Sequence, residues 1–161
     1  MNDKSDKIVF VSFSTEYFQG CQVVRYNMDE RMFDQSLKRN RCRCVRKRTY
    51  QQCDGWADFS HCLFGLPIGL SYPHFYNSPT RLKEYVGLKP NRSQHFGHML
   101  VEPQLGIPVQ ASISLQGMLN VLPIPSVPSL SKLRPGPLPL CWVRIVSVSI
   151  VYGLIRIIIK I

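Results

Sequence analysis

Four of the six cysteines fall within one short stretch, "RCRCVRKRTYQQCDGWADFSHC", which runs from Arg41 to Cys62. Cys42 and Cys44 are separated by a single residue, and a bridge between such near neighbours is strained, so we expect them to have different partners. A bridge from Cys44 to Cys53 closes easily, and a loop of roughly ten residues contributes about 2.5–3 kcal/mol in the chain-entropy treatment. The cysteines of this stretch therefore have three possible roles: they form disulfides, bind zinc or supply a reactive thiol.

Zinc fits the spacing poorly, because structural zinc sites favour paired ligands two to four residues apart, and here one C-x-C pair is followed by two single cysteines. His61 beside Cys62 supplies a fifth candidate ligand, but a histidine there is also typical of surface or core packing, as is His74. A reactive thiol would need a partner histidine or acid, and the sequence places none at a telling position. We therefore predict no catalytic residue, no metal ligand and no cofactor.

Positive charge is concentrated beside these cysteines. The chain has a formal net charge of +10, and seven basic side chains fall within eleven residues: Lys38, Arg39, Arg41, Arg43, Arg46, Lys47 and Arg48. Such a block is usually a solvated loop and less often a docking patch for an anion. Nucleic acid is a minor alternative, because only Tyr50 lies near the run and no finger or recognition-helix motif follows it.

The residue pattern of the chain predicts strands rather than helices. Residues 7–14 and 21–26 are rich in β-branched and aromatic residues. In "VQASISLQ", residues 109–116, apolar side chains alternate with Gln and Ser, which predicts a strand with its apolar face in a core and its polar face in water. Short helical turns are expected only around residues 77–86, where Ser78 could cap a helix.

Towards the end the composition changes. Six prolines between Pro123 and Pro139 exclude a helix and a central strand, so we expect an extended connection over the surface. The last residues, 144–161, are dominated by Ile and Val. The longest uncharged run there, Ile145 to Ile155, is too short to cross a bilayer, and "MNDKSDK" at the start does not read as a signal peptide.

Several motifs in the same order resemble the ectodomain of the class B scavenger receptors, the family of the platelet fatty acid translocase, the lysosomal integral membrane protein and the insect sensory neuron membrane proteins. They are Cys42-x-Cys44, then "DFSHCLFGLPIGLSYPHFY" with Ser71-x-Pro73-His74-Phe75-Tyr76, then "GLKPNRSQH", then "VEPQLGIPVQASISLQGMLNV" with Glu102-Pro103 ahead of Gly106. "RYNMDERMFD" is similar to insect members. The resemblance covers about Val9 to Arg144.

The resemblance implies a mainly β (α+β) fold: a partial antiparallel β-barrel ectodomain with short helical insertions, incomplete as it stands. It implies that Cys44 pairs with Cys53, and that Cys42 and Cys62 are structural with partners upstream of this chain. Asn91-Arg92-Ser93 is a glycosylation sequon and fits an oxidising, lumenal or extracellular compartment. The parent would sit in the plasma membrane or in lysosomal or endosomal membranes, held by spans that this chain lacks.

On this basis residues 1–143 are expected to be a partial ectodomain, with 123–139 as a Pro-rich connection and 144–161 as a tail outside the resemblance. The function implied is that of a receptor fragment, not an enzyme. Its partners would be lipids, fatty acids, lipoproteins or anionic phospholipid surfaces, not nucleic acid, and the basic run from Lys38 to Arg48 could steer anionic ligands. The alternatives are an intracellular basic protein that binds zinc or nucleic acid, and a truncated product without activity.

Overall fold

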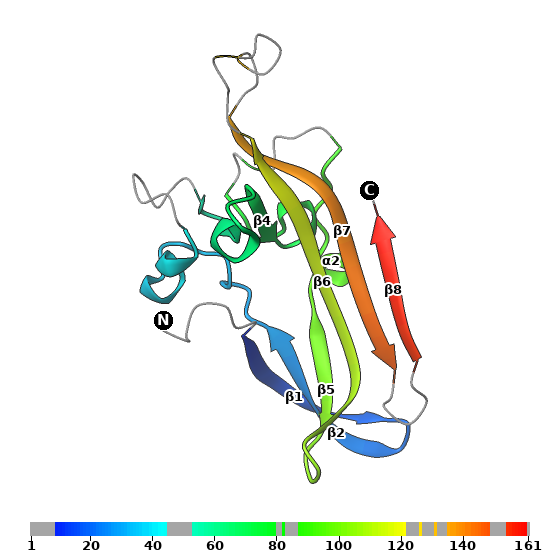
Figure 1. Cartoon of the computed structure of the whole chain (residues 1–161). Coiled ribbons are helices and arrows are strands. Elements are labelled where there is room, and N and C mark those ends of the chain that lie inside the picture. Colours follow the sequence, from blue (N-terminus) through cyan, green and yellow to red (C-terminus); the bar gives the residue numbers. More distant parts are fainter. Residues whose placement is uncertain are drawn as a thin grey trace.

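The computed structural model describes residues 9–44, 53–79, 82, 87–121, 126, 131, 135–148 and 154–160. Its strands form one antiparallel sheet (Figure 1). The strands are β1 (Phe10–Phe18), β2 (Cys21–Met28), β3 (Ala57–Asp58), β4 (Ile68–Ser71), β5 (His98–Glu102), β6 (Ile107–Val121), β7 (Gly136–Val148) and β8 (Leu154–Lys160). The helical elements are short: η1 (Lys38–Arg43), η3 (Ser60–Leu63), η4 (Pro73–Phe75) and α2 (Arg92–His95).

Strand β6 is the centre of the sheet. Along one edge it pairs with β5 through residues 107–112 and with β4 through residues 116–119. Along the other edge it pairs with β7, which in turn pairs with β8 (Figure 1). Outside β5 lie β2 and β1, and outside β4 lies β3. The described strands thus form an open sheet that does not close into a barrel, and the expected mainly β architecture with short helical insertions is confirmed.

The hairpin of β1 and β2 has the tightest turn. Phe18 pairs with Cys21, so only Gln19 and Gly20 connect the strands, and both have positive φ, 50° and 84°. Positive φ at both central residues gives the turn a twist that matches the flanking strands, and glycine adopts it without a steric penalty. The predicted strands 7–14 and 21–26 correspond to β1 and β2, with bounds shifted by a few residues.

Two clusters of buried apolar side chains pack beside the sheet. The first contains Met28, Met32, Phe33, Ala57, Tyr72 and Phe96. The second contains Cys44, Cys53, Trp56, Phe75, Leu82 and Met118. Both join residues from the segments between strands to residues of the sheet, so the short helical elements are fixed by burial rather than by helix length.

The alternation in residues 109–116 predicted the strand correctly, but the prediction for its faces was wrong. Ser112, Ser114 and Gln116 are at most 2% exposed, whereas Ile113 and Leu115 are only half-buried against the first cluster. The polar residues are buried because partners from distant segments cover them. The Gln116 amide donates to Ser71 Oγ at 3.2 Å, and Ser112 Oγ accepts from Arg144 Nε at 3.0 Å. A polar face can be buried when its hydrogen bonds are made inside the protein.

The predicted Pro-rich connection, 123–139, was also partly wrong, because β7 already begins at Gly136. Pro137 and Pro139 lie opposite Asn120 and Met118 of β6, while β8 pairs only with Trp142 and the residues after it. The prolines therefore occupy a part of β7 with a described partner on one side only, where a missing N–H costs least. The boundary expected between residues 143 and 144 falls inside β7.

Candidate functional site

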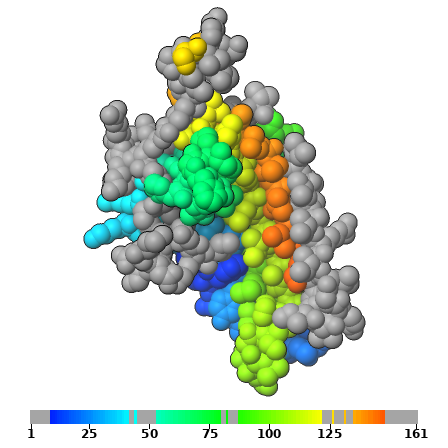
Figure 2. Space-filling view, in the orientation of Figure 1, coloured from blue at the N-terminus to red at the C-terminus, as the bar shows by residue number. Residues whose placement is uncertain are grey.

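The basic segment leaves the sheet between β2 and β3 and contains η1. Of its seven basic side chains, the structure describes those of Lys38, Arg39 and Arg41, and all three are exposed. Arg43 ends η1, and Arg46, Lys47 and Arg48 fall outside the described residues. In Figure 2 this part of the chain, in cyan, projects from one side of the molecule. The described basic side chains are therefore exposed to solvent, as both a solvated loop and a docking patch for an anion require.

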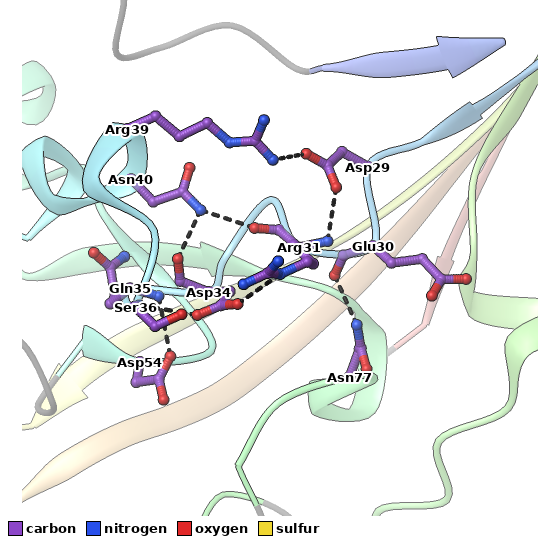
Figure 3. A network of polar contacts seen from close by, with 10 residues as sticks. All are labelled: Asp29, Glu30, Arg31, Asp34, Gln35, Ser36, Arg39, Asn40, Asp54 and Asn77. Atoms are coloured by element: carbon purple, nitrogen blue, oxygen red, sulfur yellow. Dashed lines mark hydrogen bonds and ion pairs between the residues drawn. The ribbon is translucent and has the colours of Figure 1, made fainter.

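A network of polar contacts fixes the start of this segment (Figure 3). The Asn40 side-chain amide donates to the carbonyls of Arg31 and Asp34, at 2.8 and 2.7 Å. The backbone N–H of Gln35 donates to Asp54 Oδ1 at 3.1 Å, which ties the segment to the residue after Cys53. Asn40 and Gln35 are each 3% exposed, so these bonds are made inside the protein rather than in water.

Two ion pairs of the network involve basic side chains. Arg39 pairs with Asp29 just after β2, and Arg31 Nε lies 2.9 Å from Asp34 Oδ2. A hydrogen bond from Ser36, followed by the contact with Arg31, holds the pKa of Asp34 below its ordinary value of 3.8, although partial burial opposes them. Part of the positive charge in this region is thus neutralised internally. The exposed side chains of Lys38 and Arg41 belong to a turn that the hydrogen bonds of Asn40 hold in place.

Cys44 and Cys53 form a disulfide with their Cα atoms 5.7 Å apart. Both are 2% exposed and belong to the second apolar cluster with Trp56 and Phe75. The bridge therefore closes the basic segment at its far end and anchors it in the core. It also removes two of the four thiols that the zinc alternative would need.

The remaining predicted residues lie apart from this cluster. Cys62 is an exposed free thiol at η3, Cys21 is an exposed free thiol, and Cys141 is half-buried and free; the side chain of Cys42 is not among those described. Asn91 is exposed and precedes α2, and its side-chain oxygen accepts from both the backbone N–H and the hydroxyl of Ser93, at 2.9 and 2.8 Å. Of the residues 77–86, where helical turns were expected, only 77–79 and 82 are described, and the Ser78 hydroxyl donates to the carbonyl of Gly55 at 3.0 Å.

A polar face of the sheet was missed by the sequence prediction. Across the strands, Ser112 lies opposite His98, Ser114 opposite Arg144, and Gln116 opposite both Ser71 and Trp142. Because directly paired residues share a face, all of these side chains lie on one side of the sheet. The only signal in the sequence was the Ser/Gln alternation itself, which looks the same whether the polar face is covered or solvated.

The motif Pro73-His74-Phe75 covers one end of this face. The backbone N–H of His74 donates to Gln116 Oε1 at 2.8 Å, and the His74 ring stacks on His95, with centroids 4.5 Å apart. His95 is 2% exposed and also contacts Trp142 edge-on, at 5.3 Å between centroids. This motif, one of several that carried the resemblance, is thus a packing element that joins η4 and α2 to strands β6 and β7.

The sequence pattern of the CD36 family matches residues 5–160, which include every described strand. The chain belongs to the CD36 family. This confirms the resemblance to class B scavenger receptors, and the match runs on through residues 144–160, the segment expected to lie outside it. The Cys44–Cys53 disulfide and the open mainly β sheet are therefore features of a CD36-family segment.

Individual relatives are similar over parts of the chain. Scavenger receptor class B member 1 of Mus musculus is 38% identical over 89 residues, which cover 55% of this chain and 18% of that protein. Protein peste of Drosophila melanogaster is 29% identical over 103 residues, covering 63% of this chain and 18% of the relative. An uncharacterized protein of Caenorhabditis elegans is 31% identical over 154 residues, covering 89% of this chain and 27% of the relative.

The aligned part of this chain thus spans about a fifth to a quarter of the length of the curated relatives that it matches. Among the residues that the structure describes, none of the helices has the length and apolar character needed to cross a membrane.

Proposed function

We propose that this chain is a segment of a class B scavenger-receptor-like membrane glycoprotein, and that its basic segment binds anionic lipid surfaces. The parent protein would act as a receptor that binds and transfers lipids or lipoproteins, not as an enzyme, on the extracellular or lumenal side of a plasma, lysosomal or endosomal membrane. Membership of the CD36 family supports the class of protein. The exposed basic side chains of the basic segment support an anionic lipid surface as the ligand.

The observation that carries the proposal is the way in which Lys38 and Arg41 are presented. Both are exposed on η1, while the buried amide of Asn40 between them is tied to the carbonyls of Arg31 and Asp34. A turn that is already ordered loses little conformational entropy when it meets a ligand. Basic side chains near an anionic bilayer contribute about 1 kcal/mol each.

The test is vesicle binding by the whole chain, with phosphatidylcholine vesicles that do or do not contain phosphatidylserine. The triple variant Lys38→Gln/Arg41→Gln/Arg46→Gln should bind phosphatidylserine vesicles about a hundredfold more weakly, from three lost contributions of about 1 kcal/mol. Binding should also weaken as salt is added, because ions screen exposed charges.

The matched control removes the same charge elsewhere, in Lys4→Gln/Lys7→Gln/Lys89→Gln. If the two triple variants lose the same affinity, net charge alone explains the binding and the proposed role of the basic segment is wrong. If the unaltered chain does not distinguish the two kinds of vesicle, the ligand class is wrong.

A further inference from the structure

The polar face of the sheet carries a second group of basic side chains, far along the sequence from the basic segment. Arg144 of β7 lies opposite Ser114 of β6, and His98 of β5 lies opposite Ser112. Arg144 leans along the sheet, because its Nε donates to Ser112 Oγ at 3.0 Å. The guanidinium therefore reaches towards the position that faces His98.

Charge in this group is unbalanced. Arg25 of β2, on the same face, is paired with Glu16 at 2.8 Å between Arg25 Nε and Glu16 Oε1. No ion pair joins Arg144 or His98 to a carboxylate within the described parts of the chain. Burial, and then the nearby charges of Arg25 and Arg144, lower the pKa of His98 from its ordinary value of 6.5, and Glu16 opposes them only in part.

Hydrogen bonding in this group is also incomplete. Ser114 Oγ is fully buried and has no hydrogen-bond partner among the described residues, although it lies directly across from Arg144. A buried hydroxyl without a partner costs about 1–3 kcal/mol. Proteins retain such a group where a water molecule, an ion or a ligand completes it.

We propose that this part of the sheet is a binding site for an oxyanion, a carboxylate or a phosphate group. The residues of this oxyanion site are His98, Ser112, Ser114 and Arg144. A guanidinium presents donors in a fixed fork that matches both groups, and charge-assisted hydrogen bonds are stronger than neutral ones. The Ser114 hydroxyl gains an acceptor, and the negative charge offsets the repulsion between Arg144 and a protonated His98. The site is separate from the basic segment, so it does not depend on the proposed function.

The experiment follows the histidine resonances of the whole chain by NMR while sodium phosphate or sodium acetate is added, with sodium chloride of matched ionic strength as the reference. We expect a saturable shift of the His98 signals with at least one of the two oxyanions, and a rise in the pKa of His98 when the oxyanion is bound. The comparison of phosphate with acetate shows which group the site prefers. A shift no larger than that produced by chloride would overturn the proposal and leave an ordered water as the partner of Ser114.

Three variants locate the site. Arg144→Gln should weaken binding at least about tenfold, the effect of losing a hydrogen bond to a charged group. Ser114→Ala, which removes a buried group that lacks a partner and so spares the fold, should weaken it a few-fold. Lys38→Gln, in the basic segment, should leave it unchanged. Unaltered binding by Arg144→Gln and Ser114→Ala would place the oxyanion elsewhere and overturn the assignment, whereas failure of the vesicle test would not affect it.

Discussion

The stacked rings of His74 and His95 both accept hydrogen bonds from the backbone of the same loop. The Nδ1 atom of His74 accepts a hydrogen bond from the backbone N–H of Lys89, at 3.3 Å, and the Nδ1 atom of His95 accepts one from Asn91, at 3.0 Å. In the neutral rings the proton is therefore on Nε2. The two histidines fix the backbone of the loop that carries the glycosylation sequon.

Replacing the buried histidine should loosen this loop and destabilise the protein. His95→Ala removes a ring that is 2% exposed and deprives the Asn91 N–H of its acceptor. We expect a loss of about 1–3 kcal/mol in the free energy of unfolding, measured by urea denaturation. His61→Ala, at an exposed position, should change it by less than about 0.5 kcal/mol; equal losses in the two variants would contradict the role given to His95.

Removing the disulfide should destabilise the chain by a similar amount. Cys44→Ala/Cys53→Ala opens a loop of roughly ten residues, and the chain-entropy treatment gives about 2.5–3 kcal/mol. Cys21→Ala, at an exposed free thiol, is the control and should be close to neutral. Mass spectrometry after alkylation without reduction should find Cys21 and Cys62 modified and Cys44 and Cys53 protected, and modification of all of them would refute the bridge.

Close packing makes one glycine of β4 sensitive to substitution. A Cβ atom at Gly69 would lie 2.6 Å from a ring carbon of Trp56, itself buried in the second cluster. Gly69→Ala should therefore cost about 1–3 kcal/mol through overpacking. At Gly117 of β6 the nearest atom to an added Cβ is 3.9 Å away, so Gly117→Ala should be tolerated. Thermal unfolding of the two variants side by side tests this, and a tolerated Gly69→Ala would mean that Trp56 is less tightly held.

Stability should fall as the solution is acidified. Because the folded protein lowers the pKa of His98 below 6.5, the unfolded chain binds its proton first, and stability decreases as the pH falls through 6.5 to the lower folded value. Hydrogen bonds from Ser14 and Arg25 lower the pKa of Glu16 below 4.5, so its stabilising effect is present above pH 4.5 and is lost at lower pH. His98 and Glu16 therefore both make the folded protein less stable as the pH falls.

Urea midpoints measured between about pH 7.5 and about pH 5.5 isolate the first effect. His98→Gln should flatten this part of the profile. A profile of His98→Gln as steep as that of the parent would mean that another group titrates there.

Expression in a secretory cell, with a signal peptide fused ahead of Met1, should attach a glycan to Asn91, as proposed from the sequon. The side chain is exposed, and its oxygen already accepts from the Ser93 hydroxyl. Ser93→Ala should abolish the mass increase that glycosidase treatment removes, whereas Ser93→Thr should preserve it, because threonine retains the hydroxyl. An unmodified Asn91 in the secreted protein would contradict the prediction.

Local patterns in the sequence predicted β1, β2 and the middle of β6, and the resemblance implied the Cys44–Cys53 disulfide, but the surroundings of β6 were not predicted. Alternation specifies that Ser112 and Ser114 share a face, yet whether that face is covered depends on Arg144 and on η4, which lie far away in the sequence. Proline statistics exclude a central strand but cannot indicate that β8 begins to pair only at Trp142. The stacking of His74 on His95 is equally non-local. In each case the decisive contact joins segments that no local pattern relates.

Because β6 is bordered by β5 and β4 on one side and by β7 on the other, its register is decided by three partners at once. A slip of one residue against β7 would place an isoleucine or a leucine opposite Arg144 in place of Ser114. A slip against β4 would break the bond from Gln116 to Ser71, so misaligned pairings are strongly disfavoured on both edges. The ribosome completes β6 before β7 exists. During synthesis the edge of β6 that pairs with β7 is therefore unpaired for a time, and an unpaired strand edge makes an incomplete chain prone to aggregation.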